Sequence, residues 1–429
     1  MKNISTFLFF SLLAVIFFSR QVTLNAQGTM KQDSIVMSAA YANEVYYSMK
    51  NGIVMIGSRN TWDIAFRTMK RSSSILTNDG AGVVLYTYPK SDTTGWNTMD
   101  TVGLSTWKPM YNDPNDWENG AFSRNARGHP DYGWCKYNDV THNLVGDSLF
   151  VIKVRDGSFK KLWIVKKYSS ADIYLFRYAN LDGSSPNEVL LNLSTMNQDF
   201  FGYSIQTNEP INFEPTKFLW DIVFTKYVSV QSDGSPYPVV GVLSNDSVKV
   251  KHFHPVSPTY SDFGAGTWDS TRSPIGWNWK KFDMGSYTYL VPDSNDYFVK
   301  PVQGDIYKLY FTAFNSGTAA NSPGLVKFSL GKVAGAGFTA LNNNDIQLSV
   351  FPNPASNRIH INMTGYTGED LTFTLTDLSG RQLRADRPRR MTDGFNAYSM
   401  DVAGVQPGIY FVTVSNAAMK TVAKVIISR

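Results

Sequence analysis

Alternating apolar and polar residues, interrupted by short turns, run through most of the 429-residue chain. Trp62–Phe66 (WDIAF) and Ile346–Val350 (IQLSV) both follow this pattern. Because successive side chains of a β-strand point to opposite faces, a period of two predicts strands. Gly, Asn, Asp and Ser separate the stretches, as is typical of tight turns. The pattern therefore predicts an all-β protein.

Two of these strand patterns occur twice, in the same order. Trp62–Phe66 returns as Trp220–Phe224 (WDIVF). Further along, Val151–Ile164 aligns without a gap with Phe298–Phe311, and each reads as a strand, a Gly turn and a second strand. That pattern predicts a β-hairpin in each copy. We expect the Trp, Ile and Phe of the first motif to share one strand face and to form half of a core.

The repetition predicts two homologous antiparallel β halves, residues 27–200 and 201–336. The sequence leaves open whether the halves share one sheet or form two domains. A linker rich in Gly, Ala and Asn, residues 337–345, is expected to follow them.

Residues 346–429 predict a third and smaller module, an Ig-like β-sandwich. It contains four motifs: Phe351–Ala355 (FPNPA), Asp377–Gly380 (DLSG), Pro407–Tyr410 (PGIY) and Lys424–Ile427 (KVII). In this order they resemble the C-terminal sorting domain of proteins exported by the type IX secretion system of Bacteroidetes. The residues expected to carry the signal are Pro352, Asn353, Pro354, Gly380, Pro407, Gly408 and Lys424. The resemblance implies recognition by the secretion machinery, removal of the domain, and either attachment to surface lipopolysaccharide or release.

The first 26 residues are expected to be a signal peptide. Lys2 supplies the positive start, Phe7–Phe18 the apolar run, and Leu24–Ala26 a small-residue site for cleavage after Ala26. The apolar run is too short to cross a bilayer comfortably, and no other stretch approaches transmembrane length. We therefore expect a protein that is exported through the periplasm and is secreted or held at the outer surface.

The repeated motifs also resemble those of the HmuY family, haem-binding proteins of the same phylum. In that family a Trp-Asp-Ile-x-Phe strand precedes a Gly-rich segment, and a Tyr-Lys-Leu-x-Phe strand lies near the C-terminus. The second half matches at Trp220–Phe224 and Tyr307–Phe311, whereas the first half has the looser Lys160–Ile164. The resemblance implies two tandem copies of a non-catalytic module that binds haem or another small hydrophobic ligand.

Haem iron needs axial His or Met donors inside an apolar slot. In the HmuY family the ligands lie between the two motifs, where this chain has His129 and His142. Aromatic residues that could stack on a porphyrin surround them in the sequence: Trp117, Phe122, Tyr132, Trp134 and Tyr137. Met99 and Met110 are further candidates, because Met can replace His in relatives. Gly128–Pro130 also has the composition of an ordinary turn.

Other chemistry is only weakly indicated. His252 and His254 would share a strand face and could hold a metal, but a surface pair before Pro255 is the simpler interpretation. The sequence lacks the usual nucleophile, zinc-protease, phosphate-loop and dinucleotide motifs, so we expect no enzyme. Asp63 and Asp221 are expected to hold neighbouring turns rather than to act in catalysis.

The alternative to haem binding is a surface adhesion or glycan-binding protein that keeps the fold without haem ligands. Trp277 and Trp279 would share one face if their segment were a strand. Exposed indoles could then stack on sugar rings, whereas buried ones would be core; we favour the core.

Composition narrows the remaining classes. Aromatic residues reach 14% and charged residues only 17%, as expected for strands and turns. The net charge of +5 is spread out except for Arg381–Arg390, which is expected to be a solvated loop, so nucleic-acid binding is not indicated. The single cysteine, Cys135, cannot form an internal disulfide and is expected to be a buried structural residue.

Overall fold

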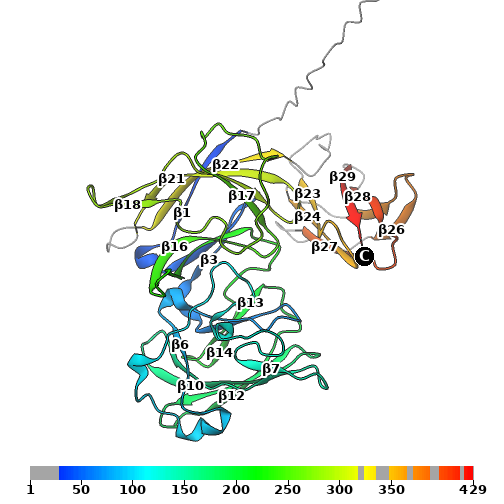
Figure 1. Ribbon diagram of the computed structural model, residues 1–429. Helices are drawn as coiled ribbons and strands as arrows, with labels where there is room; N and C mark the ends of the chain where they lie inside the picture. Colours follow the sequence, from blue (N-terminus) through cyan, green and yellow to red (C-terminus); the bar gives the residue numbers. More distant parts are fainter. Residues whose placement is uncertain are drawn as a thin grey trace, which may run out of the picture.

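The computed structural model describes residues 29–316, 323–334, 347–364, 371–386, 396–415 and 420–428 (Figure 1). The expected signal peptide, including Ala26, and the expected linker 337–345 lie outside these residues. The described chain consists of antiparallel sheets with short 3-10 segments, so the all-β prediction is confirmed. The 3-10 segments are η1 (Ala39–Tyr41), η2 (Arg59–Thr61), η3 (Asp79–Ala81), η4 (Thr93–Thr98), η5 (Leu104–Thr106) and η6 (Ala121–Ser123).

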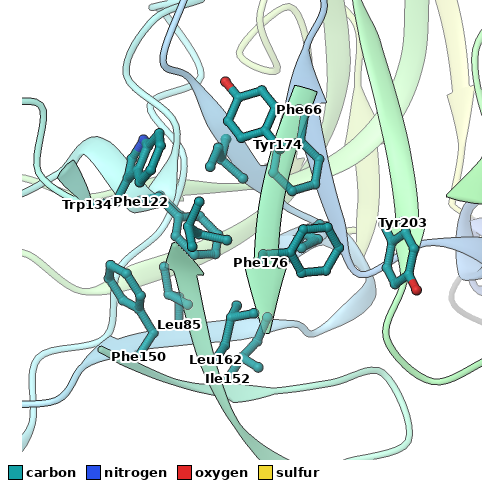
Figure 2. Packing of buried hydrophobic residues seen from close by; sticks show 14 of the residues in the cluster. Phe66, Leu85, Phe122, Trp134, Phe150, Ile152, Leu162, Tyr174, Phe176 and Tyr203 are labelled. Atoms are coloured by element: carbon teal, nitrogen blue, oxygen red, sulfur yellow. The ribbon is translucent and has the colours of Figure 1, made fainter. Parts of the chain in front are cut away.

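Residues 59–214 form what we call the first unit. Its strands are β4 (Ile64–Arg67), β5 (Ile75–Thr77), β6 (Val84–Thr87), β7 (Cys135–Tyr137), β8 (Leu144–Gly146), β9 (Phe150–Lys153), β10 (Phe159–Tyr168), β11 (Ile173–Asn180), β12 (Asn187–Asn192), β13 (Phe200–Ser204) and β14 (Glu209–Ile211). One sheet has the order β14-β13-β4-β5, and the other contains β12-β11-β10-β9-β6 with β8 and β7 beside β10. Rings such as Phe66, Trp134, Tyr174 and Phe176 pack between them (Figure 2).

Residues 29–58 and 215–334 together form the second unit. Its strands are β1 (Lys31–Val36), β2 (Asn43–Ser48), β3 (Gly52–Ser58), β15 (Ile222–Val230), β16 (Pro236–Ser244), β17 (Lys249–Phe253), β18 (Lys281–Asp283), β19 (Thr288–Leu290), β20 (Asp296–Lys300), β21 (Ile306–Asn315) and β22 (Leu325–Ala334). Its sheets have the orders β3-β2-β15-β16 and β1-β22-β21-β20-β17, and β18 and β19 form a separate hairpin. A second core, which includes Tyr47, Phe224 and Phe328, lies between the sheets.

The two units repeat one strand arrangement. The order β14-β13-β4-β5 corresponds to β3-β2-β15-β16, and β12-β11-β10-β9-β6 corresponds to β1-β22-β21-β20-β17. The register agrees as well: Tyr203 lies opposite Ile64 in the first unit, and Tyr47 lies opposite Ile222 in the second. The repeat is therefore equivalent residue by residue around the Trp-Asp motif.

The two units do not coincide with the predicted contiguous halves, residues 27–200 and 201–336. Strands β1–β3, at the start of the chain, occupy in the second unit the places that β12–β14 occupy in the first. Strands β13 and β14, beyond residue 200, belong to the first unit. Alternation reveals where a strand is but not which distant strand it pairs with, so the motifs alone could not place these boundaries.

The first residue of the repeated motif does not share a face with the others, so that prediction is wrong. Trp62 packs with Ala65, while Ile64 and Phe66 point into the main core of the first unit. The second copy behaves in the same way, with Trp220 packed beside Val223. The reason is that each strand begins only at the Ile, after the Trp and the Asp, so the period of two does not extend back to the Trp.

The aspartate of each motif is buried and organises the chain around it. The amide of Asp63 donates to Tyr203 O at 3.0 Å, and the Asp63 carbonyl accepts from the amide of Asn78 at 3.0 Å. The Asp63 carboxylate accepts from Arg155 Nε at 2.9 Å and from the amide of Gln206 at 3.2 Å. In the second unit the Asp221 carboxylate accepts from the amide of Met49 at 2.6 Å. Both aspartates thus hold neighbouring segments, as expected.

The C-terminal segment forms a small sandwich with its own core, as predicted. Its strands are β23 (Gln347–Phe351), β24 (Arg358–Thr364), β25 (Thr372–Thr376), β26 (Gln382–Asp386), β27 (Asn396–Asp401), β28 (Gly408–Ser415) and β29 (Lys420–Ile427). The sheet β23-β24-β27 faces the sheet β26-β25-β28-β29. Ile359, Phe373 and Val412 are completely buried between them. In Figure 1 the sandwich lies beside the second unit, at the red end of the chain.

Candidate functional site

A small, partly open cavity lies where the two units meet. Residues of 62–80, 112–117 and 200–214 line it from the first unit, and residues of 44–46, 220–228, 243–244 and 272 from the second. The space open to the centres of water molecules is about 60 Å³, which is room for roughly four to six waters. Since both units supply its walls, the cavity exists only when they are packed together.

Equivalent positions of the repeat line this cavity from the two units. The pairs are Trp62 with Trp220, Leu76 with Leu243, and Thr77 with Ser244. The equivalence rests on shared backbone bonds: the amide of Asn78 donates to Asp63 O at 3.0 Å, and that of Asn245 donates to Asp221 O at 2.9 Å. The cavity therefore lies where the same face of each unit meets the other.

Aromatic contacts hold the walls in place. Trp62 stacks on Phe213 with ring centroids 4.5 Å apart, and Trp220 meets Tyr46 edge to face at 5.0 Å. Trp117 packs against the guanidinium group of Arg272, whose Cζ lies 5.1 Å from the ring centroid. Offset and edge-to-face rings are the favoured aromatic geometries, so these walls are well defined.

Three buried carboxyl groups line the cavity. Glu44 accepts from the hydroxyl of Thr225 at 2.6 Å, Asp79 from Asn112 Nδ2 at 2.9 Å, and Glu214 from the amide of Phe200 at 2.7 Å. Burial raises the pKa of each carboxyl group, and that of Asp79 reaches about 7. Hydrogen bonds to the carboxylates oppose this effect without cancelling it.

The same walls contain hydrogen-bond donors that have no acceptor. Nε1 of Trp62, Trp117 and Trp220 is buried without a partner, and so is Nε of Arg272. Burial lowers the pKa of Arg272, and the nearby Glu214 and Asp79 oppose that shift. Buried donors almost always find an acceptor in folded proteins. These four nitrogens have almost no accessible surface, so the cavity is the candidate binding site because polar side chains of both units line it.

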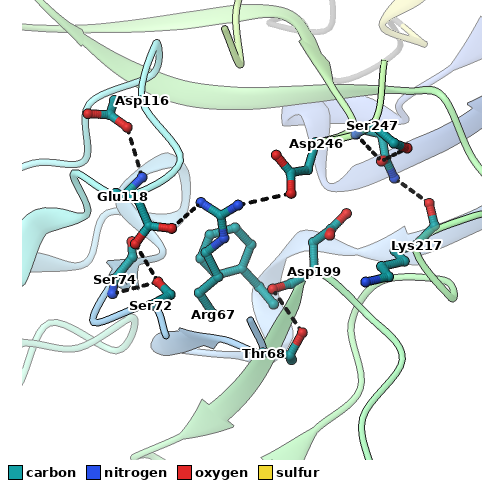
Figure 3. Close-up of polar contacts among 12 residues, drawn as sticks. Arg67, Thr68, Ser72, Ser74, Asp116, Glu118, Asp199, Lys217, Asp246 and Ser247 are labelled. Atoms are coloured by element: carbon teal, nitrogen blue, oxygen red, sulfur yellow. Dashed lines mark hydrogen bonds and ion pairs between the residues drawn. The ribbon is translucent and has the colours of Figure 1, made fainter. Parts of the chain in front are cut away.

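An ion network beside the cavity fastens the two units together (Figure 3). Arg67 of the first unit pairs with Glu118 at 2.6 Å and with Asp246 of the second unit at 2.9 Å. Burial, followed by the charge of Asp246, raises the pKa of the neighbouring Asp199 to about 7. Backbone bonds add to the junction, since the amide of Arg272 donates to Asn115 O at 3.1 Å.

The expected haem ligands fall into two groups. His129 and His142 are exposed and flank Tyr137, with ring centroids 5.3 and 5.9 Å from it. The hydroxyl of Tyr137 lies 2.6 Å from His142 Nδ1. Met99 and Met110, by contrast, are core residues: Met110 packs in the main core of the first unit, and Met99 in a smaller cluster beside it. The structure therefore brings the two histidines together and leaves the two methionines in the core.

The second histidine pair lies at the end of β17. His252 stacks on Tyr297 at 4.6 Å, and its Nε2 lies 2.9 Å from Asn295 Oδ1. His254 stacks beside it at 6.3 Å. Within the described residues, no group of three or more His, Cys, Asp or Glu side chains is placed to hold a metal ion.

Three smaller expectations have clear outcomes. Cys135 is buried in the core of the first unit, and burial raises its thiol pKa, so it is a structural residue as predicted. Trp277 and Trp279 lie in a turn rather than a strand, so they do not share a strand face. Trp279 is core and stacks on Phe311 at 4.0 Å, while Trp277 is half-buried. The basic run is described only up to Asp386: Arg381 and Arg384 are exposed as expected, but Arg384 lies in strand β26 rather than in a loop.

Sequence reasoning missed the cavity because its charged residues come from separate loops and strands. Arg272 lies in a loop and Asp79 begins the 3-10 segment η3, far apart in the chain. The available signal was the repeat itself: Trp62 and Trp220 open the two motif copies and also face the same cavity.

Asn353, one of the residues expected to carry the sorting signal, is bonded to the last strand. Asn353 donates from Nδ2 to Lys424 O at 3.1 Å, and its Oδ1 accepts from the amide of Ile426 at 2.7 Å. Pro352 and Pro354 flank this asparagine. The other marked residues shape turns: Gly380 has a positive φ of 85°, and Pro407 and Gly408 lead into β28.

Comparison with known families identifies this sandwich. Residues 349–428 match the family model of a secretion system C-terminal sorting domain. The protein is thus exported by the type IX route, to the cell surface or beyond it, and interacts with the secretion machinery. The described residues contain no helix that is long and apolar enough to span a membrane. The match does not extend to residues 29–334, where the resemblance to haem-binding proteins stays a prediction.

Similar solved structures include two proteins of Porphyromonas gingivalis. One is PorZ, a surface component of the type IX secretion system, with 12% identity, 68% of this chain and 44% of that chain covered, and a TM-score of 0.15. The other is latent PorU, with 12% identity, 67% and 31% covered, and a TM-score of 0.17. This chain thus spans less than half of either protein, and TM-scores this low assign it neither a fold nor a function. No curated protein matches its sequence.

Proposed function

We propose that this exported protein is a non-catalytic binding protein whose ligand occupies the cavity between the two units. The observation that carries the proposal is a space built by both units, in which polar side chains such as Asn112, Thr225 and Arg272 converge beside apolar ones. Binding sites for small molecules usually combine a mostly apolar wall with a few converging polar groups.

The test is to fill the cavity. Leu76 lies on its wall, so Leu76→Trp is expected to occupy the space and to abolish ligand binding to the full mature chain. Leu190 is exposed on β12, away from the cavity, and Leu190→Trp is the matched control that should leave binding intact. Binding to these variants can be followed by calorimetry. Tryptophan fluorescence can be used instead with Leu76→Phe and Leu190→Phe, which add no tryptophan. Undiminished binding in the Leu76 variant, at an unchanged melting temperature, would refute the proposal.

A second candidate function is haem binding at His129 and His142. It is favoured by their position on either side of Tyr137, where both rings are accessible. Haemin titration of the full mature chain should then give a sharpened Soret band at one equivalent that weakens in His129→Ala or His142→Ala. Met99→Ala and Met110→Ala act as controls for core packing, since both methionines are buried. A spectrum identical to that of free haemin would exclude this function.

We further propose that the exported protein is attached to surface lipopolysaccharide, as the resemblance of its sorting motifs implies. The support is the sorting-domain match over residues 349–428. Fractionation of cells producing the protein distinguishes the alternatives. Recovery with the outer membrane, at an increased and heterogeneous mass, is expected, whereas recovery only from the medium at the mass of the unmodified chain would contradict attachment.

A further inference from the structure

We propose that the second unit is a docking surface for the sorting domain, on which Phe218 covers Phe351, the first residue of the sorting motif. The secretion machinery then meets Phe351 only when the sorting domain leaves this surface. Three observations carry the proposal: the direction in which Phe351 points, the side chains that lie against it, and the bonds that fix Phe218.

Phe351 points away from the core of its own sandwich. Its neighbour Val350 belongs to that core, and successive side chains of a strand point to opposite faces, so Phe351 lies on the outer face of its sheet. Its cross-strand partner His360 shares that face, because Ile359 and Ile361 on either side of it are core residues. Phe351 is nevertheless only 3% exposed. Side chains outside the sandwich core therefore cover it.

The second unit supplies this cover. The ring centroid of Phe218 lies 5.5 Å from that of Phe351 and 6.1 Å from that of His360. Phe351 and His360 are themselves 5.7 Å apart, so the three rings form one contact. Lys217 Nζ lies 5.0 Å from the centroid of Phe218. Burial lowers the pKa of His360, and the charges of Arg358 and Lys217 add to that shift. We call Lys217 and Phe218 the docking surface.

Backbone bonds fix the docking surface to both units. The amide of Lys217 donates to Asn197 O of the first unit at 2.9 Å. The carbonyl of Lys217 accepts from Asn245 Nδ2 of the second unit at 2.6 Å. The position of Phe218 is thus defined where the two units are packed together.

Docking competes with recognition of the motif. A partner that binds Phe351 has to displace Phe218, so its apparent affinity falls in proportion to the fraction of chains in which the domain is undocked. Truncating Phe218 removes a large apolar contact and raises that fraction. It leaves the sorting domain itself unchanged, including the bonds of Asn353 to β29.

Hydroxyl-radical footprinting of the chain without its signal peptide measures how exposed each phenylalanine side chain is. In the parent we expect Phe351 to be labelled as weakly as Phe373 of the sandwich core. In Phe218→Ala the labelling of Phe351 should rise several-fold while Phe373 stays protected, which shows that the sandwich remains folded. Phe282→Ala, at an exposed position on β18, is the matched control and should leave Phe351 protected. Strong labelling of Phe351 in the parent, or unchanged labelling in Phe218→Ala, would overturn the docking surface.

The titration of His360, followed by NMR, tests the same contact from the side of the sorting domain. The chain has five histidines, so their ring signals can be resolved. Phe218→Ala and Phe351→Ala each uncover His360, and its titration midpoint should rise toward the value of about 6.5 for an exposed histidine. The midpoints of the other histidines should not move. An unchanged midpoint of His360 in both variants would also overturn the docking surface.

Pulse labelling of cells that export the protein tests whether docking hides the motif. The Phe218→Ala chain should reach the surface faster than the parent, as measured by protease accessibility of intact cells, and Phe282→Ala should arrive at the rate of the parent. Equal or slower arrival of a Phe218→Ala chain whose Phe351 is more exposed would overturn the hiding of the motif and leave the docking surface standing.

Discussion

The amide of Asp221 donates a hydrogen bond to the carbonyl oxygen of Tyr47 at 2.9 Å, and this bond joins β15 to a strand from the start of the chain. Its counterpart in the first unit, from Asp63 to Tyr203, spans 3.0 Å. In the first unit the partner follows the aspartate in the sequence, whereas in the second unit it precedes it. The N-terminal strands therefore complete the last repeat, and the whole first unit is inserted between them and the rest of the second unit.

Because the N-terminal strands complete the second unit, we can predict which unit each of the equivalent residues Tyr47 and Tyr203 stabilises. Tyr47→Ala should destabilise the second unit by about 3 to 5 kcal/mol, because Tyr47 is buried against Phe328 and Phe224. Hydrogen exchange should accelerate in Tyr307–Phe311, far along the chain, and stay slow in Leu162–Ile164. Tyr203→Ala is the matched control, and the two segments should then exchange in the opposite order. Faster exchange of Leu162–Ile164 in the Tyr47 variant would contradict the closure.

Many strands and the internal repeat could be predicted from the sequence, because both depend on local patterns of residues. The period of two placed strands such as β10 and β21, and the repeat of Trp-Asp-Ile-x-Phe revealed that the body has two equivalent parts. Which strands pair with each other could not be predicted from these patterns. Nothing in the composition of Asn43–Ser48 indicates that it pairs with Ile222–Phe224 rather than with its own neighbours in the sequence. Long-range pairing depends on the packing of the whole fold, and the local pattern of apolar and polar residues does not show it.

The burial of Asp221 predicts a specific dependence of stability on pH. Burial raises its pKa from 3.8 to about 7. Between these values the folded state keeps a proton that the unfolded chain has lost, so stability falls as the pH rises. The free energy of unfolding of the parent, minus that of Asp221→Asn, should decrease by up to about 4 kcal/mol from pH 4 to pH 7. Chemical unfolding at four or five pH values measures it. A difference that stays flat, or rises with pH, would show that the carboxyl group is ionised in the folded protein.

A buried ion pair in the second unit provides another test. Lys308 Nζ lies 2.8 Å from Asp296 Oδ2, and both side chains are completely buried. Asp296→Ala would leave the ammonium group buried without its counter-charge, which should cost about 3 to 5 kcal/mol. The double variant Asp296→Leu/Lys308→Met removes both charges and should recover most of that loss. Thermal unfolding of the single and double variants checks this, and equal losses in both would mean that the pair is not coupled.

The candidate site shows why chemistry was harder to predict than strands. His129 and His142 were recognisable as donor residues, and the structure does bring them to the same tyrosine. Arg272, Asp79 and Glu214 carry no signature, since Arg272 and Glu214 are single charged residues in loops and Asp79 lies in the short segment η3. These three residues form one site only because the two units pack against each other. That packing depends on side chains throughout both units.

The last prediction concerns how the sorting motif holds its domain together. Asn353 bridges two backbone groups of β29, donating to Lys424 O at 3.1 Å and accepting from the amide of Ile426 at 2.7 Å. Asn353→Ala leaves both groups without this partner, so the sandwich should lose about 1 to 3 kcal/mol of stability. Because the sorting domain directs export, less protein should reach the surface and more should remain in the periplasm. Protease accessibility of intact cells measures this. Ser356→Ala, an exposed change three residues further on, is the control and should be exported like the parent. Normal export of an Asn353→Ala protein with a measurably less stable sandwich would contradict the prediction, because export would then depend neither on Asn353 nor on its bonds to β29.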